Sequence, residues 1–265
     1  MGRGRSGRTS SPQPRTQSQQ RPQPQEQQQG QPQEQQRRRT PQEWLTYFNT
    51  ADDNQARSAL NEWRQERMDA DNRSNDTDVQ RFFHNIGWTE NAPKVYDETQ
   101  YQTAWRAAGQ PKQLYHADKD FNGISAAEFA NQYFGQARDS TGNQYRHYVS
   151  NGYYGGGTYF ADSALGSSFY GTSQFRGFLN NKARVVDFRT LRQRYNSYAA
   201  SHPAFKRMMS RMKAGYGGED EKLSVFAAMQ GYNVIRRNDY YVVLDRSATT
   251  VSTSTRSTRR LRGNW

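Results

Sequence analysis

Apolar residues recur at helical spacing in three segments that come after residue 40. Thr40, Pro41 and Glu43 form the signature of a helix start, because they supply a cap, a proline at the first helical position and a glutamate that completes a capping box. The spacing predicts helices from residue 41, over 52–68 and over 77–85, the last stopping at Gly87. Their inward-facing residues would be Trp44, Leu45, Phe48, Ala56, Leu60, Trp63, Val79, Phe82 and Phe83. Periodicity is compatible both with a separate helical bundle and with a layer packed on the rest of the chain.

From residue 92 onward, short apolar and β-branched runs are mixed with helical patterns. The runs predict strands over 113–117, 158–161, 175–179, 183–188 and 240–244. Helical spacing predicts helices over 125–133, where Ser125 and Glu128 suit a capping box, and near 190–199, 204–213 and 221–230. Strands and helices do not alternate regularly, which favours an α+β fold over a doubly wound sheet.

The first 39 residues have a different composition, dominated by Gln, Arg, Pro, Ser and Gly. They contain no aromatic and no β-branched aliphatic residue, so they cannot bury enough apolar surface to offset the entropy of ordering. Only 32% of the whole chain is hydrophobic, which means that burial is concentrated in the remainder. We therefore expect residues 1–39 to be a disordered arm.

The net charge of +12 is concentrated near the two ends of the chain. Residues 1–40 hold eight arginines and two glutamates, and residues 247–265 hold four arginines and no acidic residue. The part between them therefore carries only +2. Such termini either attract nucleic acid or another polyanion by counterion release, or act as solvated tails. Neither alternative says what the middle of the chain does.

The sequence also excludes several classes of site. It has no cysteine, which rules out disulfides, thiolate zinc sites and a thiol nucleophile. No apolar run approaches the roughly 18 residues of a membrane span, and the amino terminus lacks a signal-peptide core, so we expect no membrane contact and a cytoplasmic or virion-associated protein. His84, His147 and His202 show no metal-ligand spacing, so no metal site is expected.

The stretch GGGTYFADSALGSSFYG, residues 155–171, carries the clearest candidate chemistry. Its glycines allow a close backbone approach or a tight turn, and Tyr159 comes next on a short strand. Ser163, Ser167 and Tyr170 are spaced to share one face of the next helix. Two tyrosines can hold a flat aromatic group between them, with a serine bonding its polar substituent. Taken alone, the pattern is more often that of an ordinary sheet corner.

Together with QLYHADKD at 113–120, the stretch resembles the ADP-ribosyltransferase family, in the branch of diphtheria-type toxins and poly(ADP-ribose) polymerases. That branch has a leucine-aromatic-His-Gly strand, then Gly-x-Gly-x-Tyr-Phe-Ala, with a serine eight and a tyrosine eleven residues beyond the first tyrosine. The resemblance implies that His116 bonds the adenosine ribose of NAD and that Ala117, where the family has glycine, contacts NAD through its backbone. It also implies that Tyr159 and Tyr170 sandwich the nicotinamide and that Ser167 binds its carboxamide.

A third family motif departs from the pattern. NDYYVVLD aligns with Asn-Glu-Tyr-Ile-Val-Tyr-Asp and puts Tyr240 at the position of the catalytic glutamate. Asp239 comes one residue earlier, on the other face of the strand, and is a poor substitute. The resemblance then implies transfer of single ADP-ribose units without chain elongation. Glu219-Asp220-Glu221 imitates a signature of the arginine-modifying branch, but we interpret it as a charged helix start.

The resemblance implies a split mixed β-sheet core over 92–251, preceded by a helical region at 40–91 and succeeded by a basic tail at 252–265. We expect a mono-ADP-ribosyltransferase with catalytic residues His116, Tyr159 and Tyr240, which uses NAD as substrate and modifies a protein or nucleic-acid acceptor. Two alternatives remain: an inactive binding or structural protein with the same fold, and a nucleic-acid binder anchored by its basic termini. The end of the chain is also similar to ADP-ribosyltransferase-like domains of phage virion proteins.

Overall fold

The computed structural model describes residues 38–65, 77–118, 125–131, 134, 150–152, 155–171 and 173–257. Most of the predicted arm, up to residue 37, lies outside the described residues. Its last two residues were assigned wrongly, because Arg38 and Arg39 make defined contacts. Arg39 bonds Glu62 at 3.0 Å, and its guanidinium lies 4.5 Å from the ring centroid of Trp44. Order therefore begins before the capping threonine.

The three N-terminal helices form where the apolar spacing predicted them. They are α1 (Pro41–Thr50), α2 (Asp53–Gln65) and α3 (Asp78–Asn85). The capping box at Thr40 is confirmed, since its side chain accepts from the backbone N–H of Glu43 at 3.2 Å and Glu43 accepts from the N–H of Thr40 at 2.7 Å. A second box joins Thr77 and Gln80 at the start of α3.

The rest of the chain contributes six further α-helices and nine strands among the described residues. The α-helices are α4 (Glu98–Ala107), α5 (Ala126–Ala130), α6 (Ala164–Ser168), α7 (Phe188–Ser201), α8 (Pro203–Arg211) and α9 (Glu219–Met229). Two short 3₁₀ helices are η1 (Trp88–Glu90) and η3 (Arg246–Ala248). The strands are β1 (Lys94–Tyr96), β2 (Leu114–Asp118), β3 (Ser150–Gly152), β4 (Gly155–Ala161), β5 (Ser173–Leu179), β6 (Val185–Asp187), β7 (Val234–Arg237), β8 (Tyr240–Val243) and β9 (Thr249–Ser257).

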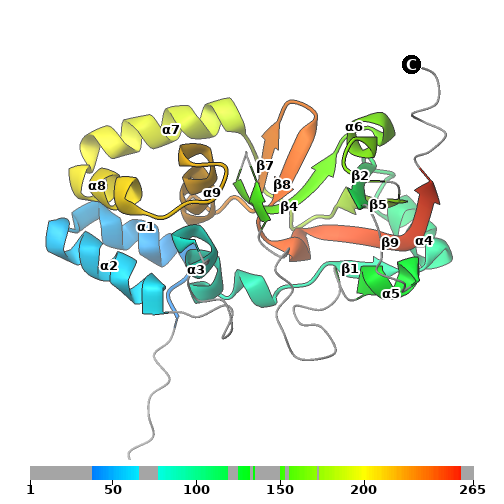
Figure 1. The fold of residues 1–265 in the computed structure, drawn as a ribbon, viewed down its shortest axis with the longest axis horizontal. Coiled ribbons are helices and arrows are strands. Elements are labelled where there is room, and N and C mark those ends of the chain that lie inside the picture. The colour runs from blue at the N-terminus through cyan, green and yellow to red at the C-terminus, as the bar shows by residue number, and fades with distance from the viewer. Residues whose placement is uncertain are drawn as a thin grey trace, which may run out of the picture. The chain divides into compact units, whose positions relative to one another are not determined.

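The strands form one mixed sheet, which makes the fold α+β as predicted (Figure 1). Eight strands lie in the order β1-β9-β5-β2-β4-β8-β7-β6, and β3 pairs with β4 off this path. The pairs β1–β9 and β6–β7 are parallel, and the other pairs are antiparallel. Between β2 and β4 the ladder has a single register pair, Tyr115 with Ala161. Among the described residues, the two halves of the sheet are therefore joined between β2 and β4 by a single residue pair.

The predicted basic tail begins too early. Residues 252–257 belong to β9, which pairs with β5 on one side and with β1 on the other. The run TTVSTST looks polar, but its threonines and valine are β-branched and suit a pleated surface. Val251 and Ser252 have no exposed surface. The remaining tail residues, from 258, lie outside the described residues.

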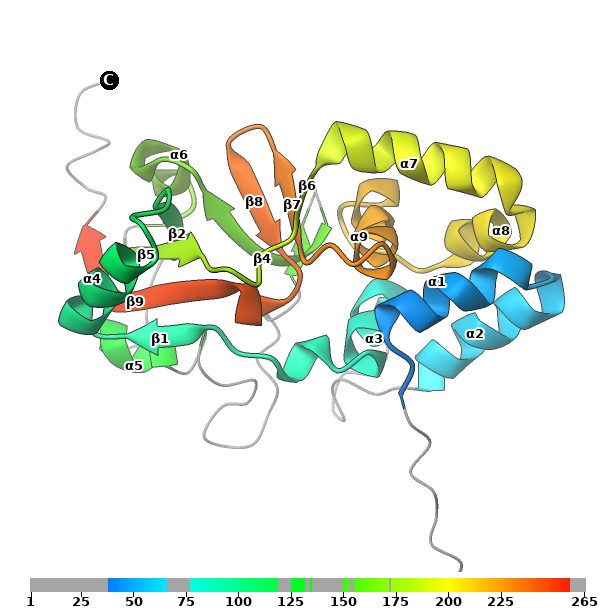
Figure 2. The same cartoon turned by 180° about the vertical axis from the view of Figure 1, so that it is seen from behind.

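The N-terminal helices share a hydrophobic core with the C-terminal half of the chain, which we call the first core. Its largest buried side chains come from α1, α2, α3, α8 and α9: Trp44, Phe48, Trp63, Phe82, Phe83, Phe205 and Phe226. Figures 1 and 2 show α1, α2 and α3 lying against α8 and α9 beside the sheet. The helices are thus a layer packed on the rest of the chain and not a bundle of their own. A second core lies around Leu114, Phe134, Phe160, Phe175 and Val251.

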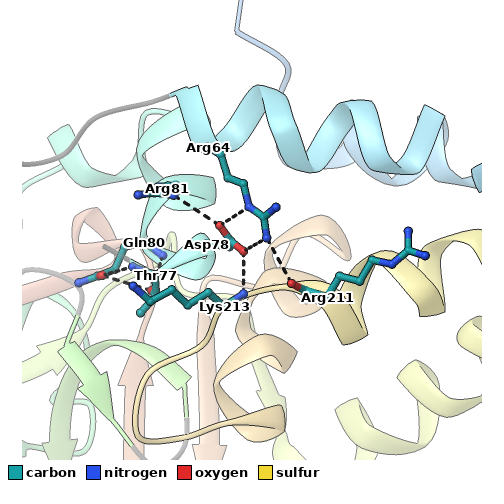
Figure 3. A network of polar contacts seen from close by, with 7 residues as sticks. All are labelled: Arg64, Thr77, Asp78, Gln80, Arg81, Arg211 and Lys213. Atoms are coloured by element: carbon teal, nitrogen blue, oxygen red, sulfur yellow. Dashed lines mark hydrogen bonds and ion pairs between the residues drawn. The ribbon is translucent and has the colours of Figure 1, made fainter. Parts of the chain in front are cut away.

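Asp78 ties α3 to α2 and to the segment after α8 (Figure 3). It has no exposed surface, and its carboxylate accepts from Arg64 through Nε at 3.0 Å and Nη2 at 2.9 Å. The backbone N–H of Lys213 donates to the same carboxylate at 2.6 Å, and the N–H of Asp78 donates to the carbonyl of Lys213 at 2.8 Å. The hydrogen bond to Asp78 raises the pKa of Arg64. One buried carboxylate therefore joins three segments that are distant in sequence.

Glu221 is a second buried carboxylate, in the first turn of α9. It has no exposed surface, and its Oε2 accepts from the backbone N–H of Gly215 at 2.6 Å. Its Oε1 is buried without a hydrogen-bond partner among the described residues. Burial raises its pKa to about 7, although bonds from the backbone of Gly215 and Gly217 act in the opposite direction. The predicted helix start is confirmed, but Glu221 belongs to the interior and not to a solvated charged turn.

Candidate functional site

The strands and helix that carry the predicted site residues are neighbours in the sheet. β4 lies between β2 and β8, and two residues separate the end of β4 from the start of α6. Ser163 caps α6 by accepting from the N–H of Gly166 at 3.0 Å. Three segments far apart in sequence, bearing the histidine, the glycine-rich stretch and Tyr240, are therefore brought to one place.

Tyr159 and Tyr240 share one face of β4 and β8, where Tyr159 packs against the first core and Tyr240 meets Tyr170. Ala161 pairs with Tyr240 and Tyr159 with Val242, so alternation puts Tyr159 and Tyr240 on the same face. The rings of Tyr170 and Tyr240 meet edge to face with centroids 6.1 Å apart. Tyr170 keeps 58% of its surface exposed. We call Tyr159, Tyr170 and Tyr240 the tyrosine cluster. Its rings provide the kind of surface on which a flat aromatic group stacks.

His116 lies where β2 and β4 separate. Beyond the pair of Tyr115 with Ala161, its Nδ1 lies 2.7 Å from the carbonyl oxygen of Tyr159. A carbonyl only accepts, so Nδ1 carries the proton and the lone pair of the neutral ring is on Nε2. The ring itself packs against Phe134 and Phe160, with centroids 5.3 and 5.7 Å away. His116 is thus bonded to the backbone of β4, but its ring borders the second core, on the opposite face of the sheet from Tyr159 and Tyr240.

Ser167 is buried at the base of α6 and is already bonded. Its hydroxyl donates to the carbonyl of Ala164 at 3.1 Å and accepts from the side-chain amide of Gln174 on β5. A serine oxygen can accept twice, so this arrangement retains one acceptor position and no donor. Ser167 can therefore bind an amide N–H but not a carbonyl oxygen without breaking a bond. Gln174 was not predicted, because its sequence neighbours give no sign that it reaches Ser167.

Gly157 owes its place in β4 to packing rather than to a ligand. A Cβ at this position would lie 2.5 Å from the carbonyl oxygen of Val243 and 3.0 Å from a methyl group of Val242. Both atoms belong to β8, and the first is backbone, so neither can move away cheaply. The close approach predicted for the glycines is present at Gly157, and the partner there is the neighbouring strand.

Two further contacts fix the junction between β4 and α6. Lys112 donates to Asp162 at 2.6 Å, and this hydrogen bond raises the pKa of Lys112. The backbone N–H of Asp162 donates to the carbonyl of Asp239 at 2.7 Å. Asp239 itself is exposed and lies in the turn between β7 and β8, just before the strand that bears Tyr240. The contact between Lys112 and Asp162 was not predicted, because nothing in the sequence shows that these two residues, 50 positions apart, become neighbours.

The remaining predicted residues lie at the border of the site or away from it. Ala117 pairs with Gln174 in the ladder between β2 and β5. Asp220, from the Glu-x-Glu-like motif, forms ion pairs with Arg192 and Arg237. Within the described ranges, no group of three or more acidic or histidine side chains is placed to hold a metal ion. Among these same residues, no helix combines the length and apolar character needed to cross a bilayer.

Comparisons with known proteins add little to this geometry. No protein-family model matches the chain, and no curated protein matches it. Among solved structures, one described as the crystal structure of an anti-CRISPR protein aligns with 53% of this chain and 93% of its own length. The identity is 15% and the TM-score is 0.27. A score this low does not establish a common fold.

Proposed function

We propose that this protein is a mono-ADP-ribosyltransferase that uses NAD as its substrate. The observation that carries the proposal is the tyrosine cluster, which joins two motifs of the resemblance: the ring of Tyr170 meets that of Tyr240, and Tyr159 lies on the same face of the sheet as Tyr240. These motifs are about 80 residues apart in the chain, yet β4 and β8 are adjacent strands. The ADP-ribosyltransferase core, with the sheet divided near His116, is part of the same proposal.

In this proposal the tyrosine rings bind the nicotinamide and Ser167 accepts one N–H of its carboxamide. His116, with its lone pair on Nε2, accepts from a ribose hydroxyl. The bond between nicotinamide and ribose breaks with its electron pair leaving on nicotinamide. A lone pair of the acceptor forms the new bond at the same ribose carbon, and the acceptor's proton passes to water. Holding the leaving group in one orientation is the main contribution of such a site.

Tyr240 distinguishes this chemistry from that of family members with a glutamate. A tyrosine has no carboxylate to stabilise the positive charge that develops on the ribose, so it orients a hydroxyl by a hydrogen bond. We therefore propose slow transfer of single units. The acceptor is a protein or a nucleic acid.

The test is turnover of NAD. The full chain is incubated with labelled NAD and candidate acceptors, and nicotinamide release and mass-labelled products are measured. Tyr159→Ala and His116→Ala should each lower turnover at least tenfold, while Tyr216→Ala, a tyrosine 83% exposed and outside the cluster, should leave it unchanged. Tyr240→Phe keeps the ring and removes only the hydroxyl, so its turnover shows what that hydroxyl contributes. Turnover that is absent in the parent, or equal in the parent and both site variants, would overturn the proposal.

One observation favours an inactive binding protein as the second candidate. The hydroxyl of Ser167 already donates to the carbonyl of Ala164, so Ser167 can accept a hydrogen bond from the carboxamide of NAD but cannot donate one to it. Turnover separates the two functions, because an inactive relative still shows Tyr159-dependent binding of NAD by calorimetry but releases no nicotinamide.

A further inference from the structure

A small pocket lies where the start of α7 meets the end of β7. It has a volume of about 230 Å³ and is lined by Asp187, Phe188, Arg189, Arg192, Arg237 and Asn238. We call it the arginine pocket. Its volume is below the ~300 Å³ at which pockets begin to enclose whole organic ligands. Its size and its lining suit a single charged group.

Two of its arginines are held in place by the protein. The guanidinium groups of Arg192 and Arg237 lie 4.9 and 4.4 Å from the ring centroid of Phe188, within cation–π range. Both also pair with Asp220 on α9. An arginine fixed in this way loses less conformational entropy on binding an anion than a free one. The pocket is therefore pre-organised for an anionic ligand.

The third arginine and the nearby acids decide the charge balance. Arg189 is exposed and makes no ion pair with a residue that the structure describes. Asp187 opposes an anion, but its carboxylate accepts from the backbone N–H groups of Arg189 at 2.9 Å and Thr190 at 3.5 Å. Counting Asp220 as well, three arginines face two aspartates. A net positive charge of one remains in the pocket.

We propose that the arginine pocket binds a phosphate group, carried by a free nucleotide or pyrophosphate or by a nucleic-acid backbone. A guanidinium presents planar N–H donors that match phosphate oxygens, and three of them surround this volume. Arg237 is the cross-strand partner of Tyr240 and lies on the same face of the sheet. The proposal concerns binding alone and holds whether or not the protein turns over NAD.

The experiment measures binding of sodium pyrophosphate and, separately, of a single-stranded oligonucleotide of about 12 nucleotides, to the full chain at about 100 mM salt. Arg189→Gln should weaken pyrophosphate binding roughly tenfold, the loss of one charge-assisted contact. Asp187→Asn should strengthen it several-fold, because asparagine still caps α7 but has no charge. Arg194→Gln is the matched control on the same helix, since Arg194 stacks on Tyr232 outside the pocket.

The outcomes separate the two sources of phosphate. If both ligands respond to Arg189→Gln and Asp187→Asn, the pocket binds backbone phosphate; if only pyrophosphate responds, it binds a free phosphate compound. The basic termini are the same in all variants, so any polyanion that they bind does not produce this pattern. Thermal melts check folding, and Arg189 is exposed, so Arg189→Gln should melt like the parent. Absence of pyrophosphate binding, or affinities that the two pocket substitutions leave unchanged for both ligands, would overturn the proposal.

Discussion

In the first core, Trp44, Trp63 and Phe205 have no exposed surface, whereas the candidate site exposes large side chains to solvent. Phe169 keeps 74% and Leu165 44% of its surface exposed beside the tyrosine cluster. The two regions share β4 and β8, so they belong to one sheet. Burial of apolar side chains therefore stabilises the first core, whereas the apolar side chains of and beside α6 remain exposed and can contact a ligand. Substitutions in the two regions should therefore separate stability from ligand binding.

The largest loss of stability is expected from Asp78→Asn. The carboxylate joins α2, α3 and the segment at Lys213, and removing its charge leaves Arg64 facing an amide donor. The free energy of unfolding should fall by roughly 3 kcal/mol, as for a broken buried ion pair. Urea denaturation measures the change. Glu62→Gln, in the exposed pair with Arg39, is the control and should cost under about 0.5 kcal/mol. Equal losses in the two variants would contradict a structural role for Asp78.

Glu221→Gln should change how stability depends on pH. The folded protein has a raised pKa for Glu221, about 7 against 4.5, so between these values the folded state holds a proton that the unfolded state releases. Stability is therefore fully retained below pH 4.5 and is lost as pH rises to about 7. The loss amounts to about 3 kcal/mol. The glutamine variant lacks this loss, and melts between about pH 5 and pH 8 should show it gaining on the parent. Parallel pH profiles would disprove the assignment.

Gly157→Ala should destabilise the junction of β4 and β8 by about 2 kcal/mol, the usual cost of overpacking. The new methyl group would lie 2.5 Å from a backbone oxygen of β8. Gly166→Ala is the matched control, because its Cβ would meet only the hydroxyl of Ser163 at 3.0 Å and the Cβ of Ala161 at 3.5 Å. The control lies in a helix, where alanine is favoured. A thermal melt that ranks the two variants in the opposite order would refute this account of the glycine.

The smallest effect on stability is expected for Tyr170→Ala. The side chain is more than half exposed, so the free energy of unfolding should change by less than about 0.5 kcal/mol. Calorimetry should nevertheless show at least tenfold weaker binding of NAD, because one stacking surface is gone. A variant that loses stability and keeps its NAD affinity would reverse the contrast between the two regions.

The sequence was most informative where local rules decide the structure. The capping box predicted at Thr40 is an interaction between residues three apart, and α1 begins there. Strands β1 and β7, of three and four residues, are too short for a periodic signal. β9 was mistaken for a tail because its serines and threonines look like solvated residues until the partner strands are known.

For the candidate site, the sequence supplied the residues and the structure supplied their neighbours. Ser167 and Tyr170 were predicted to share one face of a helix, but α6 ends at Ser168 and Tyr170 lies beyond it, exposed where Ser167 is buried. The bond from Gln174 to Ser167 and the carbonyl contact of His116 could not be predicted, because each depends on which strands become adjacent. The burial of Glu221 was missed for the same reason, since a helix start alone does not reveal what covers it.

The position of β9 has a consequence for synthesis of the chain. Lys94 pairs with Thr250, so β1 cannot pair with β9 until the ribosome has added about 150 further residues. At roughly 5–20 residues per second, translation imposes a delay on the order of ten seconds. During that interval β5 also lacks a neighbour, and an open strand edge recruits other chains. These strand edges therefore stay open until residue 257 has left the ribosome, and a chain that ends before β9 should aggregate.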